Sequence, residues 1–312
     1  MIIDSFAQMI AQARKVEKPL SVAVAMANES HLLEALKTAG EELPLEFQLI
    51  GDGKQLETMA EAAGLDQSRV EVIHQPEPNA AARHAVALVR AGKADVLMKG
   101  TLQTAELLHA VVDKAEGISR GGVMSHLAFE EVDSYHKFFA ITDSGMLLSP
   151  DLEQKKQLIQ NAVDTFHALG NDCPKVAVLA AAETVNPKIQ ASVDAAALEQ
   201  WQKEGGIGGC VIEGPLSYDL AMDRRSVEQK GWKGAVAGDA DILVVPDLVS
   251  GNVLGKALAF SGGAKMAGII VGAKAPIVVT SRGSGAEEKY LSLLLACMMA
   301  DGDRKREGEE QP

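Results

Sequence analysis

The sequence has only three cysteines in 312 residues: Cys173, Cys210 and Cys297. They lie far apart, are odd in number and belong to no CxxC or Cys/His ligand pattern. That argues against structural disulfides and against a zinc site, and it fits a reducing compartment. The seven histidines are scattered as well, so we expect no bound metal.

Long apolar runs and a basic surplus are also missing. No stretch reaches the roughly 18 apolar residues that a membrane-spanning helix needs. The first residues, MIIDSFAQMIAQARKVEKP, lack the basic start and the continuous apolar core of a signal peptide. With 30 Lys and Arg against 43 Asp and Glu, the net charge is −13, which argues against a broad basic face for nucleic acid or anionic lipid. We therefore expect a cytoplasmic protein with no nucleic-acid or membrane partner.

The residues that are present indicate a globular α/β protein. The length suggests about two domains. Short apolar runs without polar alternation predict strands that are buried on both faces, as in a parallel sheet. Helical periodicity separates them. The predicted strands are 20–26, 45–50, 70–74, 95–98, 176–181, 209–212, 242–245, 267–271 and 276–280. In the middle, 121–132 and 137–142 follow too closely for a helix between them, which predicts neighbouring antiparallel strands near a domain junction.

Ligands of doubly wound sheets bind beyond the carboxyl ends of the strands, so polar residues at strand ends are the candidates for chemistry. The run TSRGSGAEE at 280–288 follows the last predicted strand and precedes a helix. Ser284 and Glu287 have the spacing of a capping box, which assigns Glu287 to structure. Ser281, Arg282 and Glu288 are left without a structural task, although a simple capped helix is the alternative interpretation.

Three further strand ends carry candidates, each with a structural alternative. Lys99, followed by Gly100 and Thr101, could neutralise a phosphate or could be a solvated lysine at a turn. Asp143 and Ser144 follow the strand at 137–142, where Asp-Ser-Gly is also ordinary turn chemistry.

Asn252 follows the strand at 242–245, and by residue type Ser250 or Asn252 could simply cap the next helix. Ser125 and His126 are neighbours in an apolar strand, but adjacent residues on one strand point to opposite faces. We therefore do not expect these two side chains to share a proton.

Several long blocks of the sequence resemble the phosphate acetyl/butyryltransferase family, in order, from about residue 95 to 290. They are TDSGMLLSPDLEQKKQLIQNAV, KVAVLAAAETVNPKIQAS, VIEGPLSYDLAMD, ADILVVPDLVSGNVLGKAL and AGIIVGAKAPIVVTSRG. The resemblance implies two α/β domains of the isocitrate/isopropylmalate dehydrogenase type with the active site in the cleft. The expected domains are 1–143 with 271–312, and 144–270.

The resemblance also implies a reaction, acyl-CoA plus phosphate giving acyl phosphate plus CoA, without cofactor or metal. Ser281 is then expected to stabilise the oxyanion or thiolate, Arg282 to bind phosphate, and Glu288 to act as base for the thiol. Glu288 stands where acetyl-specific members typically carry Asp. The expected substrate-binding residues are Lys99, Gly100, Thr101, Asp143, Ser144, Asn252 and Phe260.

Phe260 stands where acetyl-specific relatives have an arginine, which favours a longer, C4-like or branched acyl group. The aromatic side chain would line an acyl pocket or, alternatively, belong to the core. A homodimer is expected from the resemblance, and a locally basic cleft is expected to contain Arg282 and Lys99.

Three alternatives remain. One is a phosphate acetyltransferase of the same family, and the second is a non-catalytic acyl-CoA-binding module. The third is a decarboxylating or pyridoxine-pathway dehydrogenase on the same architecture, which would need a metal held by clustered aspartates or histidines. Asp239 and Asp241 lie close together but do not form such a cluster.

Overall fold

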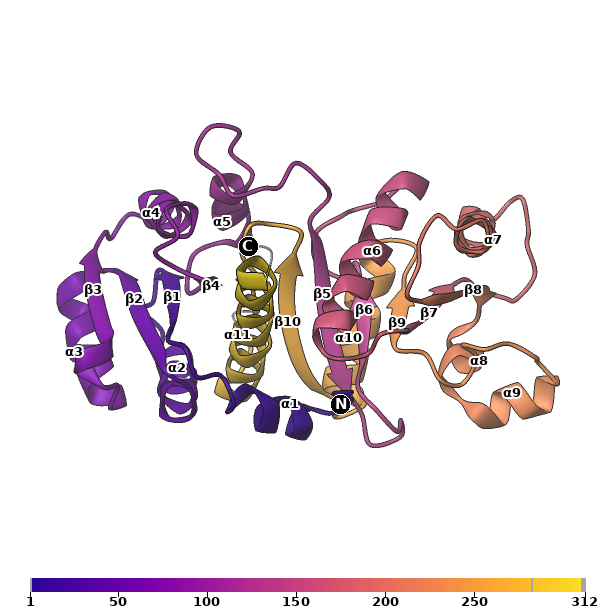
Figure 1. The fold of residues 1–312 in the computed structure, drawn as a ribbon, viewed down its shortest axis with the longest axis horizontal. Helices are drawn as coiled ribbons and strands as arrows, with labels where there is room; N and C mark the ends of the chain where they lie inside the picture. Colours follow the sequence, from indigo (N-terminus) through magenta and orange to yellow (C-terminus); the bar gives the residue numbers. More distant parts are fainter. Residues whose placement is uncertain (1, 282, 310–312) are drawn as a thin grey trace. The chain divides into compact units, whose positions relative to one another are not determined.

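A computed structural model (Figure 1) describes residues 2–281 and 283–309. The chain forms two compact units, a middle unit (Met1–Phe6 and Val123–Met266) and a terminal unit (Ala7–Gly122 and Ala267–Pro312). The units therefore change near residues 122 and 266. The domain assignment made from the sequence, 1–143 with 271–312 and 144–270, stays a prediction.

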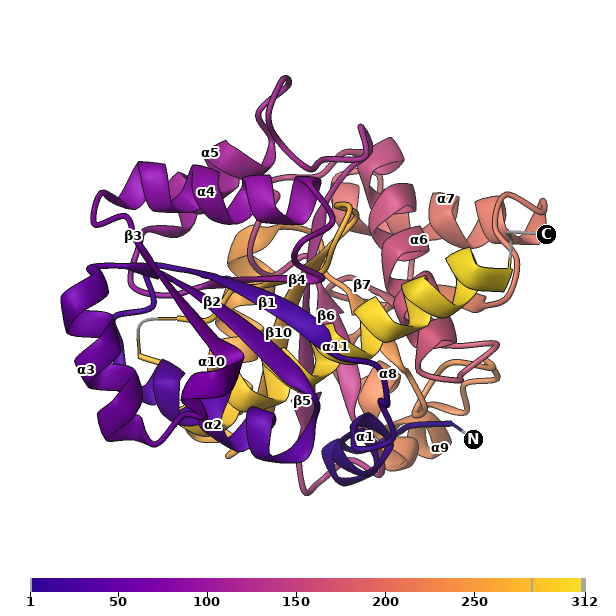
Figure 2. The ribbon, with the colours of Figure 1, turned by 60° about the vertical axis from the view of Figure 1, so that its left-hand side comes forward.

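The terminal unit contains the predicted parallel strands with helices on both faces. Its strand order is β3-β2-β1-β4-β11-β10, in which the first five strands are parallel and β10 is antiparallel to β11. In Figures 1 and 2, α4 and α5 lie on one face of β1–β4, and α2 and α3 lie on the other. The strands are β1 (Leu20–Ala25), β2 (Leu45–Gly51), β3 (Val70–His74), β4 (Val96–Lys99), β10 (Lys265–Val271) and β11 (Ile277–Val278). The helices are α1 (Phe6–Ala13), α2 (Ser30–Glu42), α3 (Gly53–Ala63), the 3-10 turn Gln67–Arg69, α4 (Pro78–Arg90), α5 (Thr104–Val111) and α11 (Ala286–Glu309).

The middle unit has the strand order β5-β6-β9-β7-β8. Strands β5 and β6 are antiparallel, as the sequence predicted, and β6, β9, β7 and β8 run parallel. The strands are β5 (Ser125–Glu131), β6 (Phe139–Thr142), β7 (Lys175–Leu179), β8 (Val211–Leu216) and β9 (Ile242–Val244). The helices are α6 (Leu152–Ala168), α7 (Gln190–Lys203), α8 (Tyr218–Met222), α9 (Arg224–Lys230) and α10 (Leu248–Ser261). The α/β class is thus confirmed, and each unit contains both parallel and antiparallel strand pairs.

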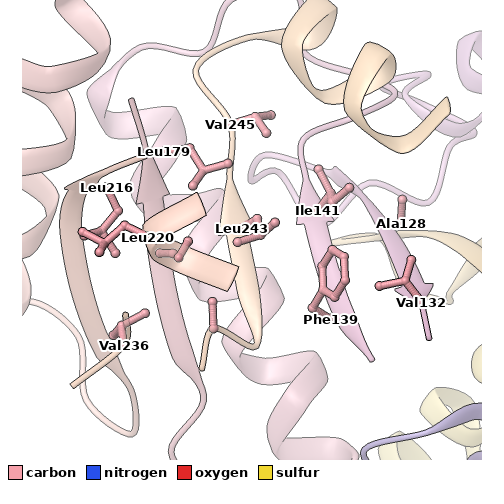
Figure 3. Close-up of a cluster of buried hydrophobic side chains, with 13 residues drawn as sticks. Ala128, Val132, Phe139, Ile141, Leu179, Leu216, Leu220, Val236, Leu243 and Val245 are labelled. Atoms are coloured by element: carbon pink, nitrogen blue, oxygen red, sulfur yellow. The ribbon is translucent and has the colours of Figure 1, made fainter. Parts of the chain in front are cut away.

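A cluster of buried apolar side chains joins strands β5–β9 of the middle unit to α8 and α10 (Figure 3). Phe139 of β6 and Leu243 of β9 are fully buried there, beside Leu220 of α8. Burying a side chain of this size stabilises a fold by roughly 1.5–3 kcal/mol. Strand runs such as FAIT and ILV carry no polar alternation because both of their faces are covered.

Parallel strands end at the same edge of a sheet, which gives each unit one edge rich in loops. In the terminal unit the loops after β1, β4 and β11 lie side by side at this edge, since β1 pairs with β4 and β4 with β11. In the middle unit the loops after β6 and β9 are neighbours in the same way. Across the part of the chain that the structure describes, no helix has both the length and the apolar composition needed to cross a bilayer.

Candidate active site

The turn between β11 and α11, together with the first turn of α11, carries three candidate residues, of which the structure describes Ser281 and Glu288. Ser281 is exposed, and its hydroxyl accepts a hydrogen bond from the Gly283 N–H at 3.3 Å. Its carbonyl accepts the Ser284 N–H at 3.1 Å, which closes the turn. Arg282 lies outside the described residues.

Glu288 lies in the first turn of α11, which begins at Ala286. Burial raises the pKa of the Glu288 carboxyl above its ordinary value, and the Ser284 hydroxyl and the Lys289 ammonium oppose that rise. A carboxylate whose pKa is raised is a stronger base than a solvated one, which suits the removal of a proton from a thiol. The environment of Glu288 therefore fits the role of general base.

Lys289, the next residue, reaches back under the same turn. Its side chain is only 1% exposed, and its ammonium donates to the Ser284 carbonyl at 2.8 Å. It also lies 3.1 Å from the carboxylate of Glu29, which follows β1. The sequence analysis did not select either residue.

The Lys99 segment lies at the same edge of the terminal unit. Strands β4 and β11 are parallel with Met98 opposite Val278, so Lys99 and the turn after β11 leave neighbouring strands at the same level. The Lys99 side chain is buried, and its ammonium donates to the carbonyls of Gly100 and Leu102 at 3.1 and 3.3 Å. The alternative of a solvated turn lysine is wrong for this reason.

Gly100 and Thr101 fasten the loop after β4 to the loop after β1. The N–H and the hydroxyl of Thr101 both donate to the Met26 carbonyl, at 2.9 and 3.3 Å. A Cβ atom at Gly100 would come within 1.9 Å of that same carbonyl oxygen. Only glycine fits at this contact, which gives Gly100 a structural role whether or not it touches substrate.

In the middle unit, Asp143 builds the turn that follows β6. One carboxylate oxygen accepts the N–H groups of Gly145 and Met146, each at 2.7 Å, and the other accepts the His126 N–H at 3.0 Å. The residue is 1% exposed. These hydrogen bonds account for Asp143 as a turn former. Its predicted role in substrate binding stays a prediction.

Ser144 has a partner that the sequence analysis missed. The Nδ1 atom of His126 on β5 lies 2.8 Å from the Ser144 hydroxyl. Burial lowers the pKa of His126, with the Asp143 carboxylate opposing, so the imidazole is neutral near pH 7. Ser125 instead accepts a hydrogen bond from Asn161, which confirms that Ser125 and His126 do not share a proton.

The two candidates on α10 lie apart from each other. Asp247 caps this helix by accepting the N–H and the hydroxyl of Ser250 at 2.8 and 3.0 Å, so the expected cap at Ser250 or Asn252 is wrong. The first turn of α10 packs against the Asp143 loop, since a Cβ at Gly251 would come within 2.8 Å of the Asp143 carbonyl oxygen. Asn252 follows directly and is exposed.

Phe260 lies eight residues further along α10, which is about 12 Å at 1.5 Å per residue. It is 84% exposed, so the alternative that it belongs to the core is wrong. Val249 and Val253, at spacings that place them on the same helix face, are exposed too. Val249, Val253 and Phe260 are thus exposed on one face of α10, which also carries the exposed Lys256. The first turn of α10 contacts the Asp143 loop, and Phe260 lies near the other end of the helix.

No metal site accompanies these groups in residues 2–281 and 283–309, where no three His, Cys, Asp or Glu side chains are placed to share an ion. The expectation of a metal-free site stays a prediction, because one candidate, Arg282, is not described.

Comparisons with known proteins agree with the blocks quoted above. A model of the family described as "Phosphate acetyl/butaryl transferase" matches residues 77–297, a range that includes all ten candidate residues. A probable phosphate butyryltransferase of Bacillus subtilis is 43% identical over 281 residues, 90% of this chain and 93% of that protein. Phosphate butyryltransferase of Clostridium acetobutylicum is 38% identical over 299 residues, 96% of this chain and 99% of that protein.

A solved structure has the same fold. The branched-chain phosphotransacylase of Enterococcus faecalis matches with a TM-score of 0.81 and 34% sequence identity. The match covers 91% of this chain and 99% of that one.

Proposed function

The chain belongs to the phosphate acetyl/butyryltransferase family, and from that membership we propose that it transfers a short acyl group between coenzyme A and inorganic phosphate. The substrates are acyl-CoA and phosphate, and the products are acyl phosphate and CoA. The observation that carries this assignment is the turn after β11, which contains the exposed Ser281. Seven residues further on lies Glu288, whose carboxyl pKa is raised by burial.

In the phosphate-consuming direction, a phosphate oxygen attacks the thioester carbonyl carbon. The carbon–sulfur bond then breaks, and CoA leaves as a thiolate that takes up a proton. In reverse, Glu288 removes the proton from the CoA thiol, the sulfur attacks the carbonyl carbon of the acyl phosphate, and inorganic phosphate leaves. General-base catalysis of this kind contributes typically about 10²–10⁴-fold to the rate.

The remaining residues bind and stabilise charge in this proposal. The Ser281 hydroxyl donates to the developing oxyanion or to the thiolate sulfur. Arg282, placed by the resemblance, binds phosphate through paired N–H groups. The buried ammonium of Lys99 adds positive charge at the same edge of the terminal unit. No cofactor and no metal take part.

The acyl group we propose is a butyryl group or a branched group of similar size. Phosphate butyryltransferases and a branched-chain phosphotransacylase are among the similar proteins. An apolar pocket discriminates by only about 1–3 kcal/mol per methylene. Butyryl has two methylenes more than acetyl, so a preference over acetyl-CoA of about 2–6 kcal/mol, or about 30- to 20,000-fold, is the expected range.

The test is phosphate-dependent release of CoA from butyryl-CoA and from acetyl-CoA, with EDTA present, in the wild type and in Glu288→Gln and Arg282→Ala. We expect release that prefers butyryl-CoA and survives EDTA. Glu288→Gln should lower kcat by about 10²–10⁴-fold, and Arg282→Ala should raise the KM for phosphate. A preference for acetyl-CoA would make the protein a phosphate acetyltransferase. Binding of CoA without turnover would make it a binding module.

The quaternary structure and the domain architecture belong to the same proposal. We propose a cytoplasmic homodimer, with domains of the isocitrate/isopropylmalate dehydrogenase type. Light scattering on the purified chain, whose protomer mass is 32.9 kDa, distinguishes a dimer from a monomer directly.

A further inference from the structure

A buried cation lies directly beneath the turn that carries Ser281. Lys289 is 1% exposed, although lysine is rarely buried unless its charge is paired. An ammonium group has three N–H donors. Here the ammonium donates to the Ser284 carbonyl at 2.8 Å and to the Ser281 carbonyl at 3.5 Å, and it forms an ion pair with the Glu29 carboxylate at 3.1 Å. Three acceptors from two loops thus surround one buried charge.

Two of these acceptors are the carbonyls of the turn itself. Ser281 and Ser284 are the first and last residues of the turn segment SRGS, and Lys289 holds both from below. Without the ammonium, two carbonyl oxygens would lose a charged donor, and hydrogen bonds to charged groups contribute about 1.5–3 kcal/mol each. The two hydrogen bonds from Lys289 therefore stabilise the turn more than the one backbone hydrogen bond that closes it, from the Ser284 N–H to the Ser281 carbonyl.

The third acceptor connects the turn to a rigid strand end. Glu29 occupies the N-cap position of α2, but its side chain makes no capping hydrogen bond there and reaches Lys289 instead. It follows β1 by four residues, just after Met26, whose carbonyl receives the two hydrogen bonds from Thr101. The pair Glu29–Lys289 thus joins the turn after β11 to the loop after β1, which is itself joined to the loop after β4.

We infer that Lys289, held by Glu29, is a positioning residue for the carbonyls of Ser281 and Ser284, so that it orients the Ser281 hydroxyl. This inference rests on the proposed function for its kinetic readout. Reactive groups need placement within about 0.5 Å to act. A small displacement of this turn is therefore enough to impair catalysis.

The ion pair also acts on the charge of Glu288. Among the described residues, the groups that bear on Glu288 from its own segment are Ser284 and Lys289. From the elements packed against α11, Glu29 ahead of α2 and Lys99 at the end of β4 are the charged groups at this edge. Removing Lys289 removes positive charge near Glu288. Removing Glu29 instead leaves the charge of Lys289 without its counter-ion.

Two variants break the same ion pair from opposite sides, Lys289→Met and Glu29→Gln. Both should lower kcat, by about 10-fold for Lys289→Met and by less for Glu29→Gln, which keeps an acceptor oxygen. The acid limb of the pH–rate profile should move to higher pH in Lys289→Met and to lower pH in Glu29→Gln. General destabilisation lowers the fraction of active protein. It cannot move the acid limb to higher pH in one variant and to lower pH in the other.

Lys137→Met is the matched control. Lys137 is also largely buried and ion-paired, with Asp241 at 2.5 Å, but it lies before β6, at the end of the strand opposite to the candidate loops. It should lose stability and keep both the wild-type kcat and the wild-type pH profile. Glu29→Gln keeps the test informative if Lys289→Met fails to fold, because Glu29 is partly exposed.

Amide hydrogen exchange separates this inference from the proposed function. Peptides covering 279–286 should exchange faster in Lys289→Met and Glu29→Gln than in the wild type or in Lys137→Met. Faster exchange in a protein that shows no CoA release would uphold the positioning role and overturn the proposed reaction. Unchanged exchange together with an unchanged kcat in an active enzyme would overturn the positioning role alone.

Discussion

His126 and Ser144 are 18 residues apart in the chain, yet Nδ1 of the imidazole lies 2.8 Å from the hydroxyl oxygen. The antiparallel pairing of β5 and β6 brings them together, with Ala128 opposite Ile141. A Cβ at Gly145 would come within 2.8 Å of the imidazole ring, so the turn is closed tightly over His126. The neutral imidazole thereby holds the Ser144 hydroxyl in one orientation.

We predict that Ser144→Ala and His126→Ala each lower kcat/KM for phosphate-dependent CoA release by about 10-fold, because loss of an oriented hydroxyl costs about 1–1.5 kcal/mol. Since each substitution removes the same interaction, the double variant should be little worse than either single one. The control is His167→Ala, which breaks a hydrogen bond to the Gly209 carbonyl elsewhere in the middle unit. Combined with Ser144→Ala, it should be additive.

The raised pKa of Glu288 predicts a specific pH dependence. The base acts only when ionised, so the activity of the wild type should fall, as pH decreases, at a pH above the ordinary value for glutamate of about 4.3. Glu288→Gln should remove this limb together with most of the rate. A pH profile of kcat/KM for both proteins measures this, and a limb in the wild type at the ordinary value would contradict the assignment.

The raised pKa of Glu288 also affects the stability of the fold, and this effect favours low pH whereas activity requires the ionised form. A carboxyl group with a raised pKa binds its proton more tightly in the folded state, so it stabilises the protein at low pH and loses that contribution as pH rises. Glu288→Gln should therefore have a higher melting temperature than the wild type at pH 7, and the difference should disappear near pH 4. Thermal unfolding at both pH values tests this, and an equal or lower melting temperature at pH 7 would count against a buried charged base.

Much of the fold was predictable because it follows from local pattern. Apolar runs without alternation mark strands covered on both faces, and β1, β3 and β9 lie within the predicted strands. The turn at Ser281 was predictable for the same reason, since a hydroxyl and two glycines follow a buried strand. The predictions that failed concern properties that depend on the surroundings of a side chain. The burial of Lys99 and the exposure of Phe260 are set by neighbouring elements that no local pattern reveals.

The contacts between side chains that are distant in the sequence were the least predictable part of the site. His126 and Ser144 meet only through the register of β5 and β6, and Lys289 meets Glu29 across 260 residues of chain. One signal was present for the second pair. A lysine that follows a candidate catalytic carboxylate in the first turn of an apolar helix puts a positive charge where a helix N-terminus disfavours it, which calls for a counter-ion.

Gly100 offers a test of the contact between the loops after β1 and β4. Gly100→Ala should be destabilised by about 1–3 kcal/mol or more, because the added Cβ meets a rigid backbone carbonyl and not a flexible side chain. Its activity should fall further than its stability, since Lys99 and Thr101 move with the loop. Gly302→Ala on α11 is the control, because a Cβ there meets nothing within 4 Å. It should stabilise the protein by about 0.5–1 kcal/mol.

A cluster of charged side chains in the middle unit lies before the strands begin, around Asp239. Its carboxylate lies 2.5 Å from Lys175, 2.7 Å from His136 and 3.2 Å from Lys137. Burial by itself would raise the pKa of Asp239, but hydrogen bonds and charge from Lys175, Lys137 and His136 hold it well below the ordinary value. The network joins the starts of β6, β7 and β9.

A depressed carboxylate pKa contributes stability above the unfolded value of about 3.9 and loses it as pH falls further. Asp239→Asn should therefore reduce the free energy of unfolding in urea by about 1–3 kcal/mol at pH 7. The gap between variant and wild type should narrow below pH 4, because the unfolded wild-type chain then takes up a proton at Asp239 that the folded carboxylate binds only at still lower pH. The control is Glu199→Gln, which breaks an exposed i,i+4 pair with Lys203 and should change stability by less than about 0.5 kcal/mol. A constant gap from pH 7 to pH 3 would show that Asp239 stabilises the middle unit through shape and neutral hydrogen bonds, and not through its charge.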